Sequence, residues 1–390
     1  MGVEASFRST IQDLVDDAAV AGISLTGQYE SLIGRTVTPP AGTIRNNGEV
    51  TGIFNLEDGR KAATLDSWGA CASRCESLLA GSFRGQSLAD RLGFPLVTFL
   101  DEHGHVLTTS VHLSHRQADA TWRLARNELI ESGISYEDIH AATRAKPDAL
   151  LTGFPTAIPF GWWHSHARRT LKATSDKGKN KPKSSGRLAD IRDEYLASYA
   201  MAPSESRSAR LFTAEFLALG VSERLRVAGK IDSLFGGVPK VVKLGGADFS
   251  DLGLGSVPPG VSDKTPSDLT YEEIESRAFF SLTGLRSLGF SDPGPARCLT
   301  VALTLLLYTL MHENLSLRAG TELKLLPPGL QASVVRHGAQ DQPMELPKVE
   351  SLADMVRDLG AEIGWQGPRS VTIRPDSPLG QVLLEVDGAQ

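Results

Sequence analysis

The feature that most constrains the fold is a long apolar run near the C-terminal third, CLTVALTLLLYTLM at residues 298–311. It falls short of the roughly 18 apolar residues that indicate a membrane span. We therefore expect a helix that is buried on all sides, which requires a large core around it. A chain of 390 residues is long enough to supply one.

The N-terminus and the cysteines indicate where the chain works. MGVEASFRSTIQDLVDD has no apolar stretch of the kind that a signal peptide needs. Three cysteines cannot form a disulfide framework and fit a reducing compartment. We therefore expect a cytoplasmic protein.

The charge is uneven along the chain. The total is −6, but residues 160–245 hold 16 Lys and Arg against 8 Asp and Glu. Within them, residues 167–187 (ARRTLKATSDKGKNKPKSSGR) have almost no large apolar side chain and cannot bury themselves. Such a run is either a solvated loop or an arm that follows phosphates, and its composition leaves both open.

Periodicity and capping residues predict a mixture of helices and strands. Asp66 is the expected N-cap of a helix that ends at Gly81 and places Ser67 and Arg74 nearly in line. The segments 94–100 and 105–111 predict a hairpin around the turn DEHG. A strand is expected at 22–25 and a loop or hairpin arm at 31–48. The other expected helices lie at 10–21, 113–132, 135–145, 188–200, 271–288 and 295–313.

Motifs for catalysis are weak. The chain has no phosphate-binding glycine motif and no nucleophile elbow. His164 and His166 form an HxH pair that could belong to a metal-dependent hydrolase, but no acidic partner motif accompanies it. Cys71 and Cys75 are expected to pack in the core. Trp162 and Trp163 fit a buried strand and a base-stacking pair equally well.

Nine short blocks, in order, resemble one protein family. They are GRTVTP at 34–39, LDSW…RCE at 65–76, LTTSV…HRQA at 107–118, FGWW at 160–163, SARLFTAE at 208–215, GKIDSL at 229–234, LGSVPP at 254–259, LTGLR at 282–286 and LSLRAGTEL at 315–323. The family is the CRISPR backbone subunit of type I-G systems, formerly called type I-U, in the RAMP superfamily of guide-RNA binders. Gly69, Ala70 and Lys230 depart from its pattern, and Lys230 loses the bidentate fork of an arginine.

The resemblance implies an α+β fold with an RRM-like (ferredoxin-like) palm and inserted thumb or loop elements. The palm would span residues 1–330, with 167–187 as a flexible basic loop or thumb, and 331–390 would be a C-terminal extension. The residues that it places on RNA are Arg35, Arg45, Ser67, Arg74, Ser110, His115, Arg116, Trp163, His166, Arg168, Arg169, Arg210, Lys230 and Arg318.

The expected function is that of a non-catalytic subunit with no cofactor and no metal. Copies would stack along a CRISPR RNA (crRNA) in a type I Cascade, a ribonucleoprotein of antiviral defence, and present the guide for pairing with target DNA. Partners would be crRNA, target DNA, further copies, other Cascade subunits and, indirectly, a helicase-nuclease, with no membrane. Two alternatives stay open: a metal-dependent hydrolase using His164 and His166, and a protein scaffold with no role in RNA binding.

Overall fold

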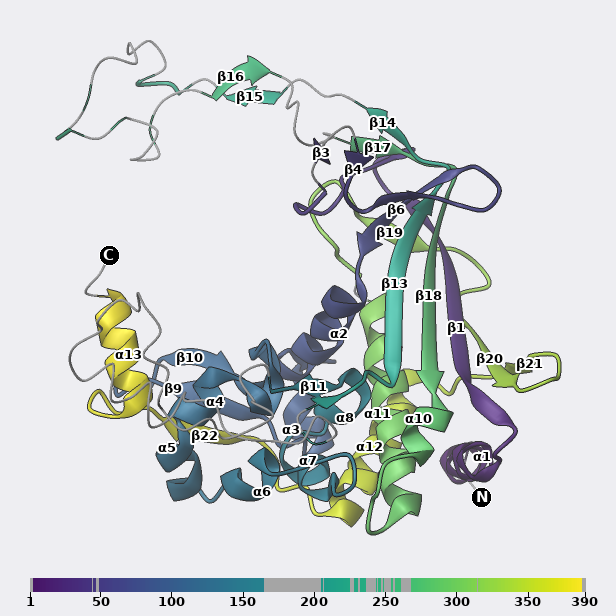
Figure 1. Cartoon of the computed structure of the whole chain (residues 1–390), viewed down its shortest axis with the longest axis vertical. Helices are drawn as coiled ribbons and strands as arrows, with labels where there is room; N and C mark the ends of the chain where they lie inside the picture. The colour runs from purple at the N-terminus through teal and green to yellow at the C-terminus, as the bar shows by residue number, and fades with distance from the viewer. Residues whose placement is uncertain are drawn as a thin grey trace, which may run out of the picture.

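A large antiparallel sheet organises the protein, as a computed structural model of the chain shows (Figure 1). The structure describes residues 3–387 apart from 44, 47–48, 165–204, 206, 225–227, 231, 236–242, 244, 247, 249–253, 255–256, 261–267 and 314. The strand order is β21-β20-β1-β18-β13-β6-β5, and β19 also pairs with β1. The strands are β1 (Val20–Ser31), β5 (Ile53–Asn55), β6 (Lys61–Asp66), β13 (Phe212–Leu219), β18 (Glu273–Ser281), β19 (Leu323–Leu325), β20 (Gln331–Arg336) and β21 (Gln342–Met344). The expected α+β class is confirmed.

The centre of the sheet joins distant parts of the sequence. Ile23 of β1 lies opposite Phe280 of β18 on one side and Val334 of β20 on the other. Buried and more exposed residues alternate along β1, so one face of the strand packs on the core. Gly22 is needed there, because a Cβ at this position would lie 2.1 Å from the carbonyl oxygen of Phe280.

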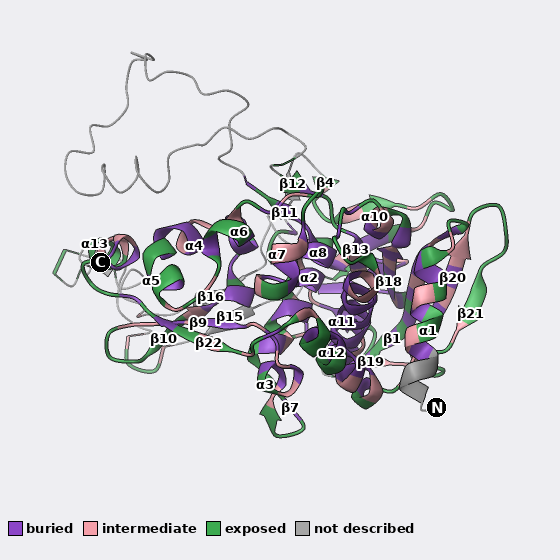
Figure 2. Cartoon of the chain, turned by 90° about the horizontal axis from the view of Figure 1, so that it is seen from below, coloured by how far each residue is buried: buried purple, intermediate pink, exposed green. Residues whose placement is uncertain are grey.

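The apolar run forms the core helix that the sequence predicts. It is α11 (Pro293–Glu313), which packs against α1 (Val3–Asp16), α2 (Trp68–Ser77), α8 (Ala157–Phe160) and α12 (Val349–Ile363). Figure 2 shows α11 buried among these elements. It is the one described helix long and apolar enough to cross a membrane, and 78% of its most apolar window is buried inside the protein.

Residues 68–163 form most of a second lobe beside the sheet. Its own sheet has the order β10-β9-β22, from β9 (Val97–Leu100), β10 (Val106–Thr109) and β22 (Arg369–Thr372). The predicted hairpin is confirmed, because β9 and β10 pair antiparallel around Asp101–Gly104. Short helices surround it: α3 (Leu88–Leu92), α4 (Ala120–Leu124), α5 (Arg126–Glu131), α6 (Tyr136–His140), α7 (Asp148–Gly153) and α13 (Pro378–Asp387), with the 3-10 turns Leu78–Ala80, Ser110–His112 and Arg116–Ala118.

Small sheets extend the upper end of the long strands (Figure 1). One has the order β14-β17-β2, from β14 (Ser222–Arg224), β17 (Asp268–Thr270) and β2 (Thr36–Val37). The pairs β3 (Arg45–Asn46) with β4 (Glu49–Val50) and β15 (Ala228–Lys230) with β16 (Val257–Gly260) are two-stranded. Within the loop or hairpin arm expected at 31–48, β3 is one arm of a hairpin with β4, whereas β2 pairs with the distant strand β17. Elsewhere, β7 (Ser82–Phe83) pairs with β8 (Gln86–Ser87), and β11 (Trp162–Trp163) pairs with β12 (Arg207–Ser208).

Several predicted elements are wrong. Most of the helix expected at 271–288 is strand β18, and only α10 (Leu282–Arg286) is helical. Buried and more exposed residues alternate along β18, which is the two-residue period of a strand. The charged residues on its exposed face hide this period in the sequence. The helix expected at 113–132 is broken into short pieces, since Asp119 caps a new helix that begins at Ala120 by accepting from the N–H of Thr121. The helix expected at 188–200 and the basic run 167–187 lie outside the described residues.

The residues after 330 join the same layers as the residues before it. β20 pairs with β1, β22 pairs parallel with β9, and α12 packs on α11. The segment expected to be an extension thus adds strands to two sheets and a helix to the core. The division of the chain at residue 330 stays a prediction.

Candidate nucleic-acid interface

The first turn of α2 starts where strand β6 ends. Ser67 is the N-cap, and its side-chain oxygen accepts a hydrogen bond of 3.4 Å from the N–H of Ala70. The prediction that Asp66 caps this helix is wrong, because Asp66 is 2% exposed and its carboxylate points to two arginines instead. The first backbone N–H groups of a helix lack partners within it, so this end carries a partial positive charge.

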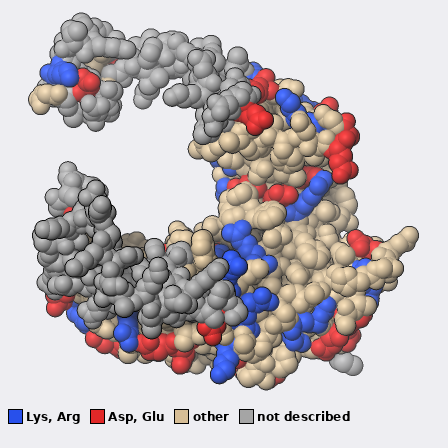
Figure 3. All heavy atoms as spheres, in the orientation of Figure 1, with Lys and Arg blue, Asp and Glu red and all other residues tan. Residues whose placement is uncertain are grey.

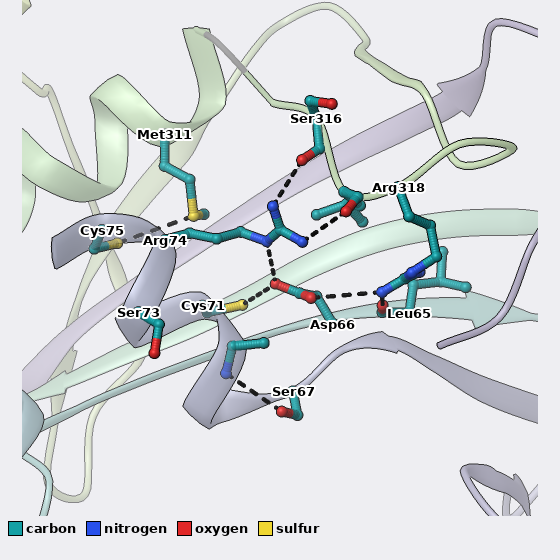
Figure 4. A network of polar contacts seen from close by, with 12 residues as sticks. Leu65, Asp66, Ser67, Cys71, Ser73, Arg74, Cys75, Met311, Ser316 and Arg318 are labelled. Atoms are coloured by element: carbon teal, nitrogen blue, oxygen red, sulfur yellow. Dashed lines mark hydrogen bonds and ion pairs between the residues drawn. The ribbon is translucent and has the colours of Figure 1, made fainter. Parts of the chain in front are cut away.

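Arg74 and Arg318 meet on the buried carboxylate of Asp66 (Figure 4). Arg74 Nε donates to Asp66 Oδ2 over 2.9 Å, and its other nitrogens donate to the carbonyls of Ser316 and Leu317. Arg318 lies 3.7 Å from Asp66 Oδ1 and donates to the carbonyl of Leu65 over 2.6 Å. Both arginines, which were predicted to contact RNA, are engaged in joining α2 to the segment before β19.

Arg116 is also part of an internal ion pair. It is buried, and it donates to both carboxylate oxygens of Glu76 over 2.8 and 2.7 Å and to the carbonyl of Gly161 over 3.0 Å. Its φ of 54° is in the left-handed region, which holds its side chain in this position at some cost in strain. Burial among these partners removes Arg116 from the surface that was expected to contact RNA.

Arg210 is different, because it is an exposed residue whose guanidinium makes no hydrogen bond or ion pair with the described residues. One of its Nη atoms lies 3.6 Å from the position that a Cβ on Gly69 would occupy, so it reaches the first turn of α2. Partial burial and the nearby charge of Arg116 lower the pKa of Arg210, while Glu76 opposes them. A cation that is repelled by its neighbour and makes no ion pair within the described part of the chain is suited to take an anion from outside.

The two tryptophans of β11 have separate environments. Trp162 is buried and pairs with Ser208, whereas Trp163 is 57% exposed and pairs with Arg207. Trp162 therefore fits the interpretation as a buried strand residue, and Trp163 has the exposure that base stacking requires. Trp163 lines a groove with Arg144, Glu205 and Arg207.

The remaining predicted residues are scattered. Ser110 is buried and accepts from the N–H of Val97 over 3.1 Å, so its hydroxyl is used inside the lobe. His115 is exposed, and Arg35 is exposed and donates to the carbonyl of Glu272. For Arg45 in β3 and Lys230 in β15 the structure describes the backbone alone. His166, Arg168 and Arg169 lie outside the described residues.

Of the two histidines predicted as possible metal ligands, His164 and His166, only His164 lies within the described residues. Its ring is buried and lies 5.2 Å, centroid to centroid, from the ring of His140. Burial, with smaller contributions from His140 and Arg123, lowers the pKa of His164 to about 3. Among the described residues no group of three or more His, Cys, Asp and Glu side chains could hold a metal ion.

Sequence reasoning missed Trp68, which is 52% exposed in the first turn of α2, and it missed Arg207 and Arg144 beside Trp163. Figure 3 shows Lys and Arg side chains gathered on the hollowed side of the molecule, where the lobe meets the sheet.

Comparisons with known proteins give a family match and a distant structural neighbour. No curated protein matches the chain. A chain of a "CRISPR RNA-guided surveillance complex, pre-nicking" is similar at a TM-score of 0.32 with 10% identity, covering 94% of this chain and 100% of that chain. Residues 23–176 match the model of the family described as CRISPR-associated protein GSU0053. The resemblance that the ordered motifs indicated is therefore confirmed at this level: over residues 23–176, the chain matches a CRISPR-associated protein family.

Proposed function

We propose that this chain is a guide-RNA-binding backbone subunit of a type I CRISPR Cascade, of subtype I-G. It is non-catalytic, and it holds the RNA by phosphate and sugar so that the bases stay free to pair with target DNA. Copies of the chain stack along one guide, next to other Cascade subunits and, indirectly, a helicase-nuclease. This complex works in the cytoplasm. The family match over residues 23–176 supports the CRISPR part of the proposal.

We infer an RRM-like palm from the order of elements in the large sheet. Four strands and two helices follow each other as β1, α2, β13, β18, α11 and β20. The four strands lie side by side in the order β20-β1-β18-β13, and each neighbouring pair is antiparallel. A split βαββαβ unit of this order is the ferredoxin-like arrangement. On this assignment, β5 and β6 are an insertion beside the palm.

The observation that carries the proposal is the position of Arg210, an exposed residue without an ion pair among the described residues, at the start of α2. The positive end of a ten-residue helix and a cation without an acid partner among the described residues lie together there. A phosphate group satisfies both, because it accepts hydrogen bonds from backbone N–H groups and from a guanidinium fork. Such contacts bind any sequence, as a guide holder requires.

The test is RNA binding by the full chain over a range of salt. Wild-type protein is titrated with a fluorescent guide-length RNA, and Kd is measured between about 50 and 200 mM salt, over which phosphate contacts weaken strongly. Arg210→Ala is expected to lower the affinity at low salt and to reduce the slope of log K against log salt by about 0.7, the value for one contact on a single strand.

The matched control is Arg357→Ala, because Arg357 is an exposed arginine on α12 that is already paired with Asp354 and Asp358. It should bind RNA as wild type does. The mass of the complex, measured by light scattering, should rise in steps with RNA length, and the RNA should stay intact. Failure of the wild-type chain to bind RNA at low salt would refute the proposal.

A further inference from the structure

Two exposed tryptophans, Trp68 and Trp163, lie close in sequence to the two glycines that Arg210 approaches. Trp68 is 52% exposed and directly precedes Gly69, which the Arg210 guanidinium approaches. At the other end, the backbone N of Arg210 lies 3.0 Å from the position of a Cβ on Gly161, and Trp163 follows two residues later. Gly161 is held at a φ of 77°, so this close approach requires glycine. The Arg210 side chain thus spans the distance between the two tryptophan segments.

Exposed tryptophans are unusual on a surface that has no partner. An indole is a large apolar group, and the core of this protein holds Trp122, Trp162 and Trp365 out of water. Two of the five tryptophans of the chain are more than half exposed. One directly precedes the glycine that the Arg210 guanidinium approaches, and the other lies two residues after the glycine that the Arg210 backbone approaches. The arrangement of cation and aromatic rings matches a surface that binds bases by their faces and phosphates by charge.

We propose that Trp68 and Trp163, with Arg210 between them, form a stacking platform for unpaired bases of the bound strand. This inference rests on the proposed function and deepens it, since it assigns a single-stranded ligand with accessible base faces. The indoles stack on bases of any type, and Arg210 holds an intervening phosphate. A duplex hides the base faces and gains nothing from the indoles.

The groove next to Trp163 fits this assignment. Arg144, Arg207 and Glu205 line it together with Trp163. A carboxylate repels phosphate and accepts hydrogen bonds from the amino groups of bases. The groove is therefore suited to a base edge next to the stacked ring, with the backbone of the strand directed toward the arginines.

The experiment compares Trp68→Ala and Trp163→Ala with Trp68→Phe and Trp163→Phe in the full chain. Affinity is measured by fluorescence anisotropy for a 20-nucleotide oligo(U), for the same strand with abasic sites, and for a duplex RNA. Each alanine variant should weaken oligo(U) binding roughly 5- to 100-fold, while the phenylalanine variants keep most of the affinity. Binding of the abasic strand and of the duplex should change less than about twofold.

Phe54→Ala is the matched control, because Phe54 is an exposed aromatic residue on edge strand β5, which lies beyond β6 in the sheet. It should bind oligo(U) as wild type does. If wild type binds and the alanine variants bind equally well, the stacking platform is wrong and the proposed function stands. An equal loss on the abasic strand assigns the tryptophans to the sugar-phosphate backbone and overturns the inference.

Two further outcomes are decisive. A change in the mass of the RNA-free protein in the alanine variants places the indoles in a protein–protein contact, which also overturns the platform. Absence of RNA binding by wild type removes both the platform and the proposed function. Thermal unfolding of each variant should match wild type, since both side chains are largely exposed.

Discussion

Arg116 and Arg210 lie close together, yet the structure gives them opposite roles that one experiment can separate. In Arg116→Ala the carboxylate of Glu76 stays buried and loses both of its guanidinium hydrogen bonds. Removing one partner of a buried pair costs about 3–5 kcal/mol. Near the melting temperature, unfolding entropy is about 2 cal/mol/K per residue, so a cooperative unit of 390 residues would lose about 5 °C in Tm.

The assay is differential scanning calorimetry combined with RNA titration. Arg116→Ala should lower Tm by about 5 °C, and the pair Glu76→Gln with Arg116→Met should recover most of the loss because no buried charge remains. Arg210→Ala should leave Tm within about 1 °C of wild type while it weakens RNA binding. A stable Arg116→Ala variant with weakened RNA binding would refute the reasoning and return Arg116 to the RNA surface.

Three more predictions follow from other contacts. Arg74→Ala removes the closer cation from buried Asp66 and should lower the free energy of unfolding, measured by urea titration, by about 2–3 kcal/mol. The loss is smaller than for Arg116→Ala because Arg318 stays near Asp66. Burial lowers the pKa of His312 to about 3 from 6.5, so the folded protein favours the neutral imidazole. The contribution of His312 to the free energy of unfolding should be complete above pH 6.5 and should fall toward pH 3 by about 1.4 kcal/mol per pH unit. His312→Gln should remove this part of the pH dependence, as urea titrations at pH 7, 5 and 4 would measure. Burial raises the pKa of Cys298 to about 11 and those of Cys71 and Cys75 further, so none of the three should react with a thiol reagent at pH 8 until the protein unfolds, and fast native labelling would contradict the burial.

The sequence predicted elements whose signal is local. The apolar run could only be a buried helix, and the DEHG turn between two apolar segments defined the β9–β10 hairpin. Strand β18 was mistaken for a helix, because its outward residues Glu273, Glu275 and Arg277 are typical of either structure. The partners that make it a strand are β13 and β1, and β1 lies about 250 residues earlier in the chain.

The same limit applies to the site residues. A cation in a matching motif is visible in the sequence, but the acid that neutralises it is not. Many residues separate Glu76 from Arg116 and Asp66 from Arg318, so nothing local distinguished Arg116 and Arg318 from Arg210. Only the fold shows that Arg210 has no such acid among the described residues, while Trp68 becomes visible as a surface group once Ser67 is recognised as the cap.

The position of β1 at the centre of the sheet has a consequence for synthesis. Its two neighbours, β18 and β20, leave the ribosome only after some 250 further residues, and at 5–20 residues per second that takes about 10–50 s. During this time both edges of a twelve-residue strand with one apolar face have no native partner. Helix α11 also emerges late, so the core around it closes in one step near the end of translation. Chains released before residue 281 should therefore aggregate, and holding factors that cover β1 should raise the yield of the folded protein.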